Sequence, residues 1–335
     1  MAQIAVIGAG SWGTALAKVL ADKGHEVALW GRAAEQVDDI EKKRVNAKYL
    51  PNAQLPATLK ATADLEAAVR DKSWIVSVVP SHTVRDVLGR AGKAMRSDAV
   101  VVSASKGIEN ESLATMDEVL KDVLPGRLGS QLAFLSGPSF AKEVGAGLPT
   151  AVVMASRDRR IAEEAAALFQ GDRFRVYTSD DVTGVELGGS LKNVMAVAAG
   201  MVDGLGLGHN SRAALITRGL AEMTRLGVAL GAKPATFAGL AGLGDLVLTC
   251  TGSLSRNRAV GVDVGRGATL AEAVAGKQTV AEGVVTTRSA HALAAREGVE
   301  MPIVATVHRI LFDGYPARLA IGELMTRELR AEQDA

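Results

Sequence analysis

The sequence predicts an α/β fold in which a doubly wound, mainly parallel sheet is followed by a domain made only of helices. Three observations support this prediction. Short apolar strands alternate with amphipathic helices up to about residue 180. A glycine-rich turn, residues 8–13, joins the first strand to the first helix. After Asp180 and Asp181 no segment has a strand pattern, so we expect domains at 1–180 and 181–335.

Length and composition limit the class of protein. A chain of 335 residues exceeds the usual size of a single core, which favours two domains. The chain has 38 Lys and Arg against 37 Asp and Glu, so we expect neither a nucleic-acid nor a membrane partner. The single cysteine, Cys250, suits a reducing compartment. Because a buried strand already begins at Gln3, we expect a cytoplasmic protein without a signal peptide.

The first strand, residues 4–7, runs into Gly8-Ala9-Gly10-Ser11-Trp12-Gly13, and an amphipathic helix follows up to Gly24. In such a turn the first glycine makes the bend and the second lets the backbone approach a pyrophosphate. The third lets helix pack on strand, and the helix start offers N–H groups to the phosphates. The alternative is a glycine-rich turn without a ligand. The flanking strand and helix favour a dinucleotide site.

The second strand, residues 27–30, ends at Gly31-Arg32. A site restricted to NAD has an Asp or Glu near this point to bind the ribose 2′-hydroxyl. Arg32 instead suits a 2′-phosphate, although a loop arginine in solvent is the alternative. We therefore expect NADP(H) to be accepted and preferred, with NAD(H) as the other cofactor.

The alternation then continues with strands expected at 74–80, 99–103, 132–136, 151–154 and 174–177, and with helices that include 81–95 and 161–169. Ligands of parallel sheets bind beyond the carboxyl ends of the strands. Pro80, Lys106 and Gly137-Pro138-Ser139 all follow such ends. A surface loop is the alternative for Lys106, but three polar strand ends at one edge favour a site.

The second half reads as helices at about 182–202, 211–230, 256–264, 284–297, 303–312 and 319–329. The first of them is apolar except for Lys192, which follows Gly188 and Gly189 by one turn. Glycine costs about 1 kcal/mol relative to alanine inside a helix, so the pair needs a compensating reason. Either the helix packs tightly and Lys192 extends to water, or Lys192 faces a site.

A second polar cluster contains Gly244-Asp245, Thr249 and Ser255-Arg256-Asn257. Asp245 fits an Asx turn, and Ser255 fits a helix N-cap followed by a solvated first turn. A capped helix start with Arg and Asn also suits a phosphate, and both interpretations stay open. The five histidines lack metal-ligand spacing, so no metal is expected.

Taken together and in order, these motifs closely resemble the bacterial NAD(P)-dependent glycerol-3-phosphate dehydrogenase family over essentially the whole chain. The matching segments are Gly8–Ala15, Ser105-Lys106-Gly107, Ser136–Ala141, Glu186–Val194, Gly242–Leu246 and Ser255-Arg256-Asn257. The resemblance implies a Rossmann domain followed by an all-α domain of the 6-phosphogluconate-dehydrogenase-like type. It also implies a homodimer that reduces dihydroxyacetone phosphate to sn-glycerol 3-phosphate for phospholipid synthesis.

The resemblance also implies roles for individual residues. Catalysis is assigned to Lys192, the family's catalytic lysine, with Lys106 and Asp245. The cofactor is assigned to Gly8, Gly10, Ser11, Trp12, Gly13, Arg32, Lys106, Ala141, Arg256, Val280 and Glu282. The substrate is assigned to Lys106, Gly137, Ser139, Lys192, Asp245, Ser255, Arg256 and Asn257.

Two other functions remain as alternatives. One is an NADPH-dependent reductase of another small 2-oxo compound, such as a ketopantoate-like acid, which would need a carboxylate site rather than a phosphate site. The other is a non-catalytic NADP(H)-binding regulator, which would not need Lys106, Lys192 and Asp245 together.

Overall fold

The structure, a computed structural model, describes residues 1–276, 281–326, 328 and 331–332. Its chain divides into two compact units. Unit 1 comprises Met1–Lys106 and Ala114–Val185, and unit 2 comprises Gly107–Leu113 and Glu186–Ala335. The boundary expected after residue 180 lies just before helix α8 (Val182–Gly204), whereas the division falls within the first turn of that helix. The short segment Gly107–Leu113 was expected in the first domain and belongs to unit 2.

Unit 1 is built on an eight-stranded sheet with the order β10-β9-β8-β7-β6-β1-β2-β5. Every neighbouring pair is parallel except β8 and β9, which are antiparallel. The strands are β1 (Gln3–Ile7), β2 (Glu26–Trp30), β5 (Leu59–Thr62), β6 (Trp74–Ser77), β7 (Val100–Ser103), β8 (Leu132–Ser136), β9 (Thr150–Ala155) and β10 (Phe174–Ser179). The order from β5 to β8 is that of a Rossmann sheet, which confirms the predicted doubly wound, mainly parallel fold.

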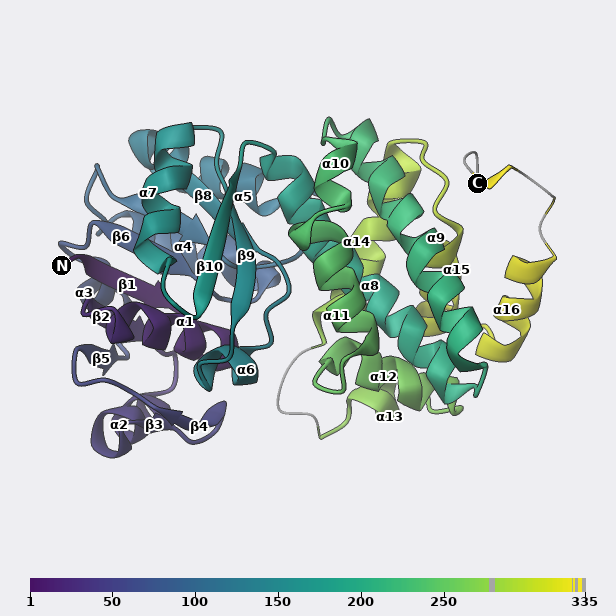
Figure 1. The fold of residues 1–335 in the computed structure, drawn as a ribbon, viewed down its shortest axis with the longest axis horizontal. Coiled ribbons are helices and arrows are strands. Elements are labelled where there is room, and N and C mark those ends of the chain that lie inside the picture. Colours follow the sequence, from purple (N-terminus) through teal and green to yellow (C-terminus); the bar gives the residue numbers. More distant parts are fainter. Residues whose placement is uncertain (277–280, 327, 329–330, 333–335) are drawn as a thin grey trace. The chain divides into compact units, whose positions relative to one another are not determined.

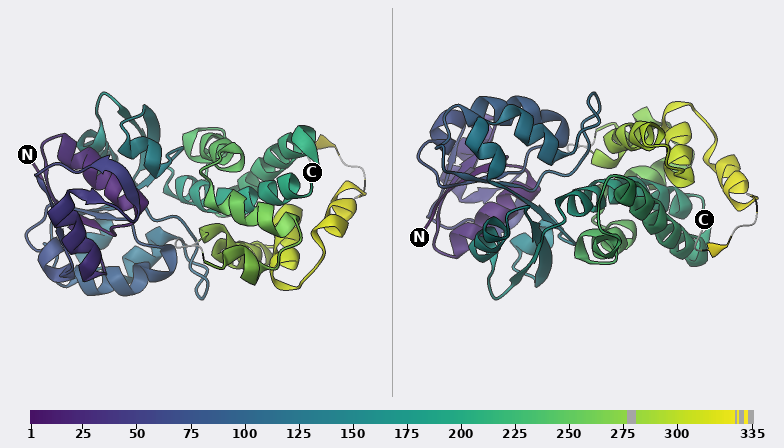
Figure 2. Two further views of the ribbon diagram at one scale, coloured as in Figure 1. Left: turned by 90° about the horizontal axis from the view of Figure 1, so that it is seen from below. Right: turned by 90° about the horizontal axis from the view of Figure 1, so that it is seen from above.

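Helices lie on both faces of this sheet (Figures 1 and 2). Strands buried on both faces are typical of parallel sheets and explain their continuous apolar runs. The helices of unit 1 are α1 (Ser11–Asp22), α2 (Ala34–Lys43), α3 (Leu65–Val69), α4 (Val84–Gly92), α5 (Met116–Val123), α6 (Ala141–Gly145) and α7 (Arg159–Phe169), with 3₁₀ turns η1 (Ser81–Thr83) and η2 (Gly126–Ser130). Helices α1 and α7 cover one face, and α4 and α5 cover the other.

The region between β2 and β6 contains elements that the sequence did not predict. A two-stranded antiparallel hairpin, β3 (Val45–Asn46) and β4 (Leu50–Gln54), follows α2 and stands apart from the main sheet. Its strands have two and five residues, so they are too short to show the alternation that marks a strand. The strand expected at 74–80 ends at Ser77, and the helix expected at 81–95 begins with η1.

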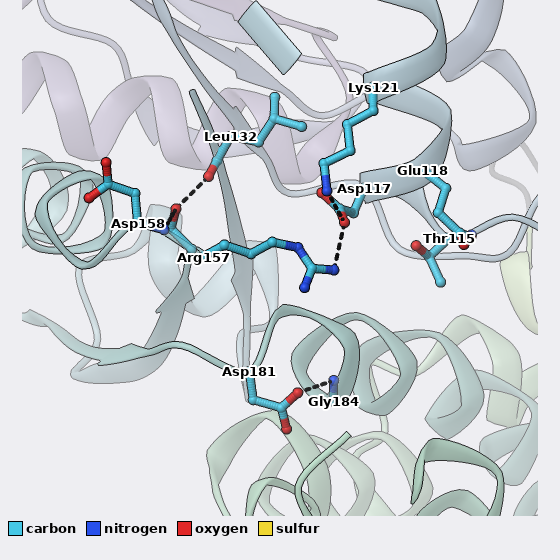
Figure 3. A network of polar contacts seen from close by, with 10 residues as sticks. Thr115, Asp117, Glu118, Lys121, Leu132, Arg157, Asp158, Asp181 and Gly184 are labelled. Carbon is cyan, nitrogen blue, oxygen red and sulfur yellow. Dashed lines mark hydrogen bonds and ion pairs between the residues drawn. The ribbon is translucent and has the colours of Figure 1, made fainter. Parts of the chain in front are cut away.

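A buried carboxylate ties α5 to the segment after β9 (Figure 3). Asp117 accepts from Lys121 Nζ at 2.8 Å and from Arg157 Nη2 at 2.9 Å. Nearby, Asp181 Oδ1 accepts from the Gly184 N–H at 2.9 Å and so caps the start of α8. The capping role expected of the Asp pair therefore belongs to Asp181.

Unit 2 is helical throughout its described part, which contains no strand. Helix α8 is apolar on all sides and buried along most of its length, as expected of a helix at the centre of a core. The other helices are α9 (Gly208–Ala229), α10 (Pro234–Phe237), the π-helical turn η3 (Leu240–Gly244), α11 (Asp245–Thr251), α12 (Arg256–Gly265), α13 (Leu270–Val274), α14 (Glu282–Arg296), α15 (Pro302–Phe312) and α16 (Ala317–Met325).

In the described chain, one stretch, Pro234–Thr251, has a length and a mean hydropathy, 1.2, that suit a membrane span. It consists of α10, η3 and α11 and includes the buried Asp245. Core helices of soluble proteins have the same composition, so the stretch is weak evidence for a membrane protein.

Candidate active site

The carboxyl ends of four parallel strands in unit 1 bring the predicted polar segments to one edge of the sheet. The glycine-rich turn follows β1, Val78–Pro80 follow β6, and Ala104–Lys106 follow β7. Gly137 and Ser139 follow β8 in the same way. The Val78 N–H donates to the Ile7 carbonyl at 2.9 Å, so the first two of these segments start side by side.

The glycines of the turn differ in how much space a side chain would have at each position. Gly8 has φ +121°, and a Cβ there would lie 2.8 Å from the Val78 carbonyl oxygen. A Cβ on Gly13 would lie 1.8 Å from the Gly8 carbonyl oxygen, so both glycines are required by the fold. A Cβ on Gly10 would meet nothing within 4 Å. Open space over Gly10, at the uncapped start of α1, fits the pyrophosphate of a dinucleotide.

The remaining cofactor candidates of unit 1 differ in exposure. Ser11 and Trp12 are half-buried in the first turn of α1, and Ala141 begins α6. Arg32 is exposed directly after β2 and Gly31. This position, at the end of the second strand, is where nucleotide-binding folds recognise the adenosine ribose.

Two substrate candidates lie in the turn after β8. Gly137 has φ +131°, a conformation that favours glycine, and Ser139 Oγ donates to the Gly137 carbonyl at 2.9 Å. The serine side chain is thereby held within the turn and half-buried.

Lys106 is the last residue of the first segment of unit 1, and its neighbour Gly107 belongs to unit 2. The Gly107 N–H donates to Ser190 Oγ at 2.9 Å, and Ser190 precedes Lys192 by two residues on α8. This bond lies within unit 2 and joins the residue after Lys106 to the helix that carries Lys192.

The central feature of unit 2 is a buried ion pair between α8 and α11. Lys192 Nζ lies 2.8 Å from Asp245 Oδ1, and Lys192 and Asp245 are only 7% and 1% exposed. Lys192 Nζ also donates to Thr249 Oγ1 at 2.8 Å. The lysine therefore does not extend to water, and the carboxylate of Asp245 is its partner. Asp245 is the first residue of α11 and directs its carboxylate to the lysine.

Gly188 accounts for the close approach of these helices. A Cβ on Gly188 would lie 2.5 Å from the Ala241 carbonyl oxygen, so only glycine admits the π-helical turn at this point of α8. Lys192 follows Gly188, and Asp245 follows Ala241, by about one turn each. Their side chains consequently meet, and the tight packing predicted for this helix serves the ion pair.

The buried Cys250 thiol shows that the surroundings of this pair have a low polarity. Burial raises the pKa of the Cys250 thiol to about 12, while the positive charge of Lys192 acts in the opposite direction. Cys250 is therefore a neutral thiol at physiological pH and acts as a small apolar side chain beside the pair.

The start of α12 holds the second polar cluster. Ser255 Oγ accepts from the Arg258 N–H at 3.2 Å, which confirms the predicted N-cap, and Arg256 is exposed. Asn257, in contrast, is buried, so the expectation of a solvated first turn is wrong for this residue. Its Nδ2 donates to Asn193 Oδ1 at 2.9 Å.

On its other side, Asn257 Oδ1 accepts from the Gly283 N–H at 2.9 Å, at the start of α14. Glu282 is the first residue of α14 and is half-buried. Val280, which was expected to contact the cofactor, lies outside the described residues.

Unit 2 thus brings Lys192, Asp245 and Asn257 into one region, whereas Arg256 remains on its surface. Two members of this region, Thr249 and Asn193, were given no role from the sequence. The spacing of Thr249, four residues after Asp245 on one helix, is the signal that would have found it. Within the described residues, no three His, Cys, Asp or Glu side chains are grouped so as to hold a metal ion.

Comparison with protein families and known proteins gives consistent matches along the chain. Residues 3–162 match the family model described as NAD-dependent glycerol-3-phosphate dehydrogenase N-terminus. Residues 181–322 match the model of the corresponding C-terminus.

Individual relatives extend this similarity to full length. The chain is 56% identical over 331 residues to glycerol-3-phosphate dehydrogenase [NAD(P)+] of Geobacter sulfurreducens, covering 99% of each chain. The crystal structure of glycerol-3-phosphate dehydrogenase from Coxiella burnetii superposes with a TM-score of 0.92 at 45% identity, covering 97% of this chain and 98% of the other. A ketopantoate reductase from Ralstonia eutropha, with a TM-score of 0.59 at 18% identity over 96% of this chain and 99% of the other, shares the fold alone.

Proposed function

Because the chain belongs to the NAD-dependent glycerol-3-phosphate dehydrogenase family, we propose that Lys192 is the acid–base group of its reaction. The reaction is the NAD(P)-dependent interconversion of dihydroxyacetone phosphate and sn-glycerol 3-phosphate. The buried pair of Lys192 with Asp245, 2.8 Å apart, is the observation that carries the proposal.

The proposed role of Lys192 follows from where charge develops. NAD(P)H, when bound, supplies a hydride to the ketone carbon. Negative charge then grows on the carbonyl oxygen, and a fixed cation contributes most where charge appears only in the transition state. An ammonium at this oxygen stabilises the charge and donates the proton that completes the alcohol. In the reverse direction, the neutral amine accepts that proton.

Asp245 and Thr249 hold Lys192 in place. A lysine side chain loses about 2 kcal/mol of conformational entropy when it is fixed, and two bonds of 2.8 Å maintain this order before the substrate arrives. Because Asp245 is itself buried, the pair is shielded from solvent and its geometry is defined. We assign Asp245 both to substrate binding and to the orientation of the lysine.

The phosphate of the substrate is assigned to the start of α12. Helix N-termini and arginine side chains both attract phosphate oxygens. The exposed guanidinium of Arg256 and the backbone N–H groups of this turn suit that role. The amide of Asn257 already bonds Asn193 and Gly283, so its contribution is mainly to hold α12 in place. Lys106, Gly137 and Ser139 complete the proposed substrate set.

For the cofactor we propose Gly8, Gly10, Ser11, Trp12, Gly13, Arg32, Lys106, Ala141, Arg256, Val280 and Glu282. The open space over Gly10 supports this assignment for the pyrophosphate, and the position of Arg32 supports it for the 2′-phosphate of NADPH. We further propose that the protein is a cytoplasmic homodimer without a nucleic-acid or membrane partner. Light scattering of the purified chain gives its mass in solution, and a monomer would contradict the dimer.

The deciding experiment replaces Lys192 by methionine, which keeps the length of the side chain and removes its charge. We expect kcat to fall by about 10³-fold or more, as for loss of a group that acts in the transition state, while the Kd of NADPH is unchanged. Lys121→Met is the matched control, because Lys121 also pairs with a buried aspartate at 2.8 Å and has no proposed role in the reaction. Near-normal turnover of Lys192→Met would refute the proposal.

Substrate class is tested separately. Oxidation of NADPH and NADH is followed with dihydroxyacetone phosphate, unphosphorylated dihydroxyacetone and ketopantoate. With NADPH at a saturating concentration, Arg256→Ala should raise the KM for the phosphorylated ketone and leave the weak reaction of the unphosphorylated ketone unchanged, since only the former carries the phosphate. An equal effect on both ketones would exclude Arg256 from phosphate binding.

A further inference from the structure

The carbonyl of Ala9, within the glycine-rich turn, is held by two side chains from outside the turn. Asn46 Nδ2 donates to it at 3.0 Å and Gln36 Nε2 donates to it at 2.6 Å. Gln36 lies on α2 and Asn46 on β3, so both come from the region that the sequence did not predict. No role has been assigned to either residue above.

Both Nδ2 hydrogens and the Oδ1 atom of Asn46 take part in hydrogen bonds. Its second Nδ2 hydrogen donates to Thr14 Oγ1 at 2.8 Å, and its Oδ1 accepts from the Tyr49 N–H at 3.4 Å. Asn46 is only 1% exposed, and a buried amide is costly unless its donors and acceptors are satisfied. Because Ala9 presents a carbonyl oxygen, the Nδ2 group must face it, which fixes the orientation of the amide.

Holding this carbonyl determines the direction of the next N–H. A peptide unit is planar and trans, so its C=O and N–H point to opposite sides. With the Ala9 oxygen turned toward Asn46 and Gln36, the Gly10 N–H points away from them. The carbonyl oxygen, which would repel a phosphate, is kept on the side of these two amides.

We propose that Asn46, assisted by Gln36, is a positioning residue for the pyrophosphate of the cofactor. It acts through the peptide between Ala9 and Gly10, which it holds in the orientation that an anion requires. This inference rests on the assignment of the glycine-rich turn to the cofactor. It deepens that assignment by adding two residues that do not touch the ligand.

A second tie from the same hairpin supports this role. Ser11 Oγ donates to the Tyr49 carbonyl at 2.8 Å, so the turn between β3 and β4 also holds the first residue of α1. The hairpin thus bonds the residue before Gly10 and the residue after it, and Gly10 is the position where a Cβ would meet nothing within 4 Å.

The test measures binding of cofactor fragments to the full chain by calorimetry. ADP-ribose contains the pyrophosphate, whereas adenosine 2′-phosphate lacks it. We expect Asn46→Ala to weaken ADP-ribose binding by about 10-fold, the effect of removing one of the two donors that hold the Ala9 carbonyl. Binding of adenosine 2′-phosphate should be unchanged, and the Gly10 amide signal in a ¹H–¹⁵N spectrum of the ligand-free protein should shift.

Three further variants keep the test decisive. Gln36→Met removes the other donor and should give a smaller loss in the same direction, even if Asn46→Ala fails to fold. Thr14→Val removes the Thr14 bond, leaves the Ala9 bonds, and should bind ADP-ribose normally. Asn52→Ala, at an exposed position of the same hairpin, is the matched control.

The outcomes separate this inference from the proposed cofactor site. If Gly10→Val abolishes ADP-ribose binding but Asn46→Ala and Gln36→Met bind normally, the positioning role is refuted and the site stands. If Gly10→Val also binds normally, the assignment of the turn itself fails. Equal losses for both fragments in Asn46→Ala would show a general structural role and would likewise overturn the inference.

Discussion

Asp245→Asn is the most informative single change, because it removes the charge of the buried pair and keeps its size. At the observed 2.8 Å, two unit charges attract by about 6 kcal/mol in a medium of effective dielectric constant about 20. The asparagine oxygen still accepts a hydrogen bond from Lys192, which recovers about 1 kcal/mol. Removing one partner of a buried pair costs about 3–5 kcal/mol in total, and we expect a loss of this size.

The loss is measured as a shift of Tm. For a domain of the size of unit 2, each kcal/mol lowers Tm by about 2–4 °C, so the expected decrease is roughly 6–20 °C. Asp22→Asn is the control, because the Lys18–Asp22 pair is exposed and pairs of that kind contribute about 0–1 kcal/mol. Turnover of Asp245→Asn should fall by about 100-fold or more, since the lysine loses its fixed position.

A double variant separates stability from catalysis. Lys192→Met with Asp245→Leu replaces the pair by apolar side chains, and such replacements often restore or increase stability. We expect Tm to return to the value of the wild-type protein while activity stays absent. An unchanged Tm in Asp245→Asn would refute the reasoning, because it would mean that the pair is solvated despite its burial.

Four further predictions concern other parts of the chain. Arg32→Ala should raise the KM for NADPH about 10-fold and leave that for NADH unchanged, because only NADPH carries a 2′-phosphate; equal changes would refute this. Burial raises the pKa of Cys250 from 9.0 to about 12, so the unfolded chain releases this proton first and stability falls as pH rises through that range. Denaturation at about pH 8 and about pH 10.5 should show a smaller loss in Cys250→Ala than in the wild type. Burial and then His308 lower the pKa of His291 from 6.5, so the unfolded chain binds the proton first and stability falls as pH drops below 6.5. Replacing His291 by Phe should reduce this acid sensitivity in denaturant titrations. Asp117→Asn should lower the free energy of unfolding by about 1–3 kcal/mol and leave kcat unchanged, and a loss of kcat would contradict a purely structural role.

The sheet of unit 1 was predictable because its strands are apolar runs bounded by turn residues. The expected strand at 132–136 coincides with β8, and the glycine-rich turn lies where the pattern predicted. Family membership and the NAD(P)-dependent reaction were also predicted from the motifs and are confirmed by the family models. The similarity to glycerol-3-phosphate dehydrogenases over the whole chain does not favour the two alternative functions.

What the sequence did not predict depends on contacts between distant residues. Asn46 looks like any loop asparagine until β3 places it under the Ala9 carbonyl. The π-helical turn Leu240–Gly244 has no pattern of its own, and only its contact with Gly188 explains it. From the sequence, the Lys192 side chain was expected either to extend to water or to face a site. Its two partners on α11 decide against water.

The segment Gly107–Leu113 has a consequence for biosynthesis. Ile108, only 2% exposed, belongs to the core of unit 2, yet it leaves the ribosome long before Leu187 and the rest of that core. At about 5–20 residues per second, the delay is on the order of several seconds. Unit 2 can therefore complete its core only after the segment from Glu186 onward has been synthesised, several seconds after Gly107–Leu113. For the same reason, a fragment that begins at Glu186 lacks a piece of its own interior.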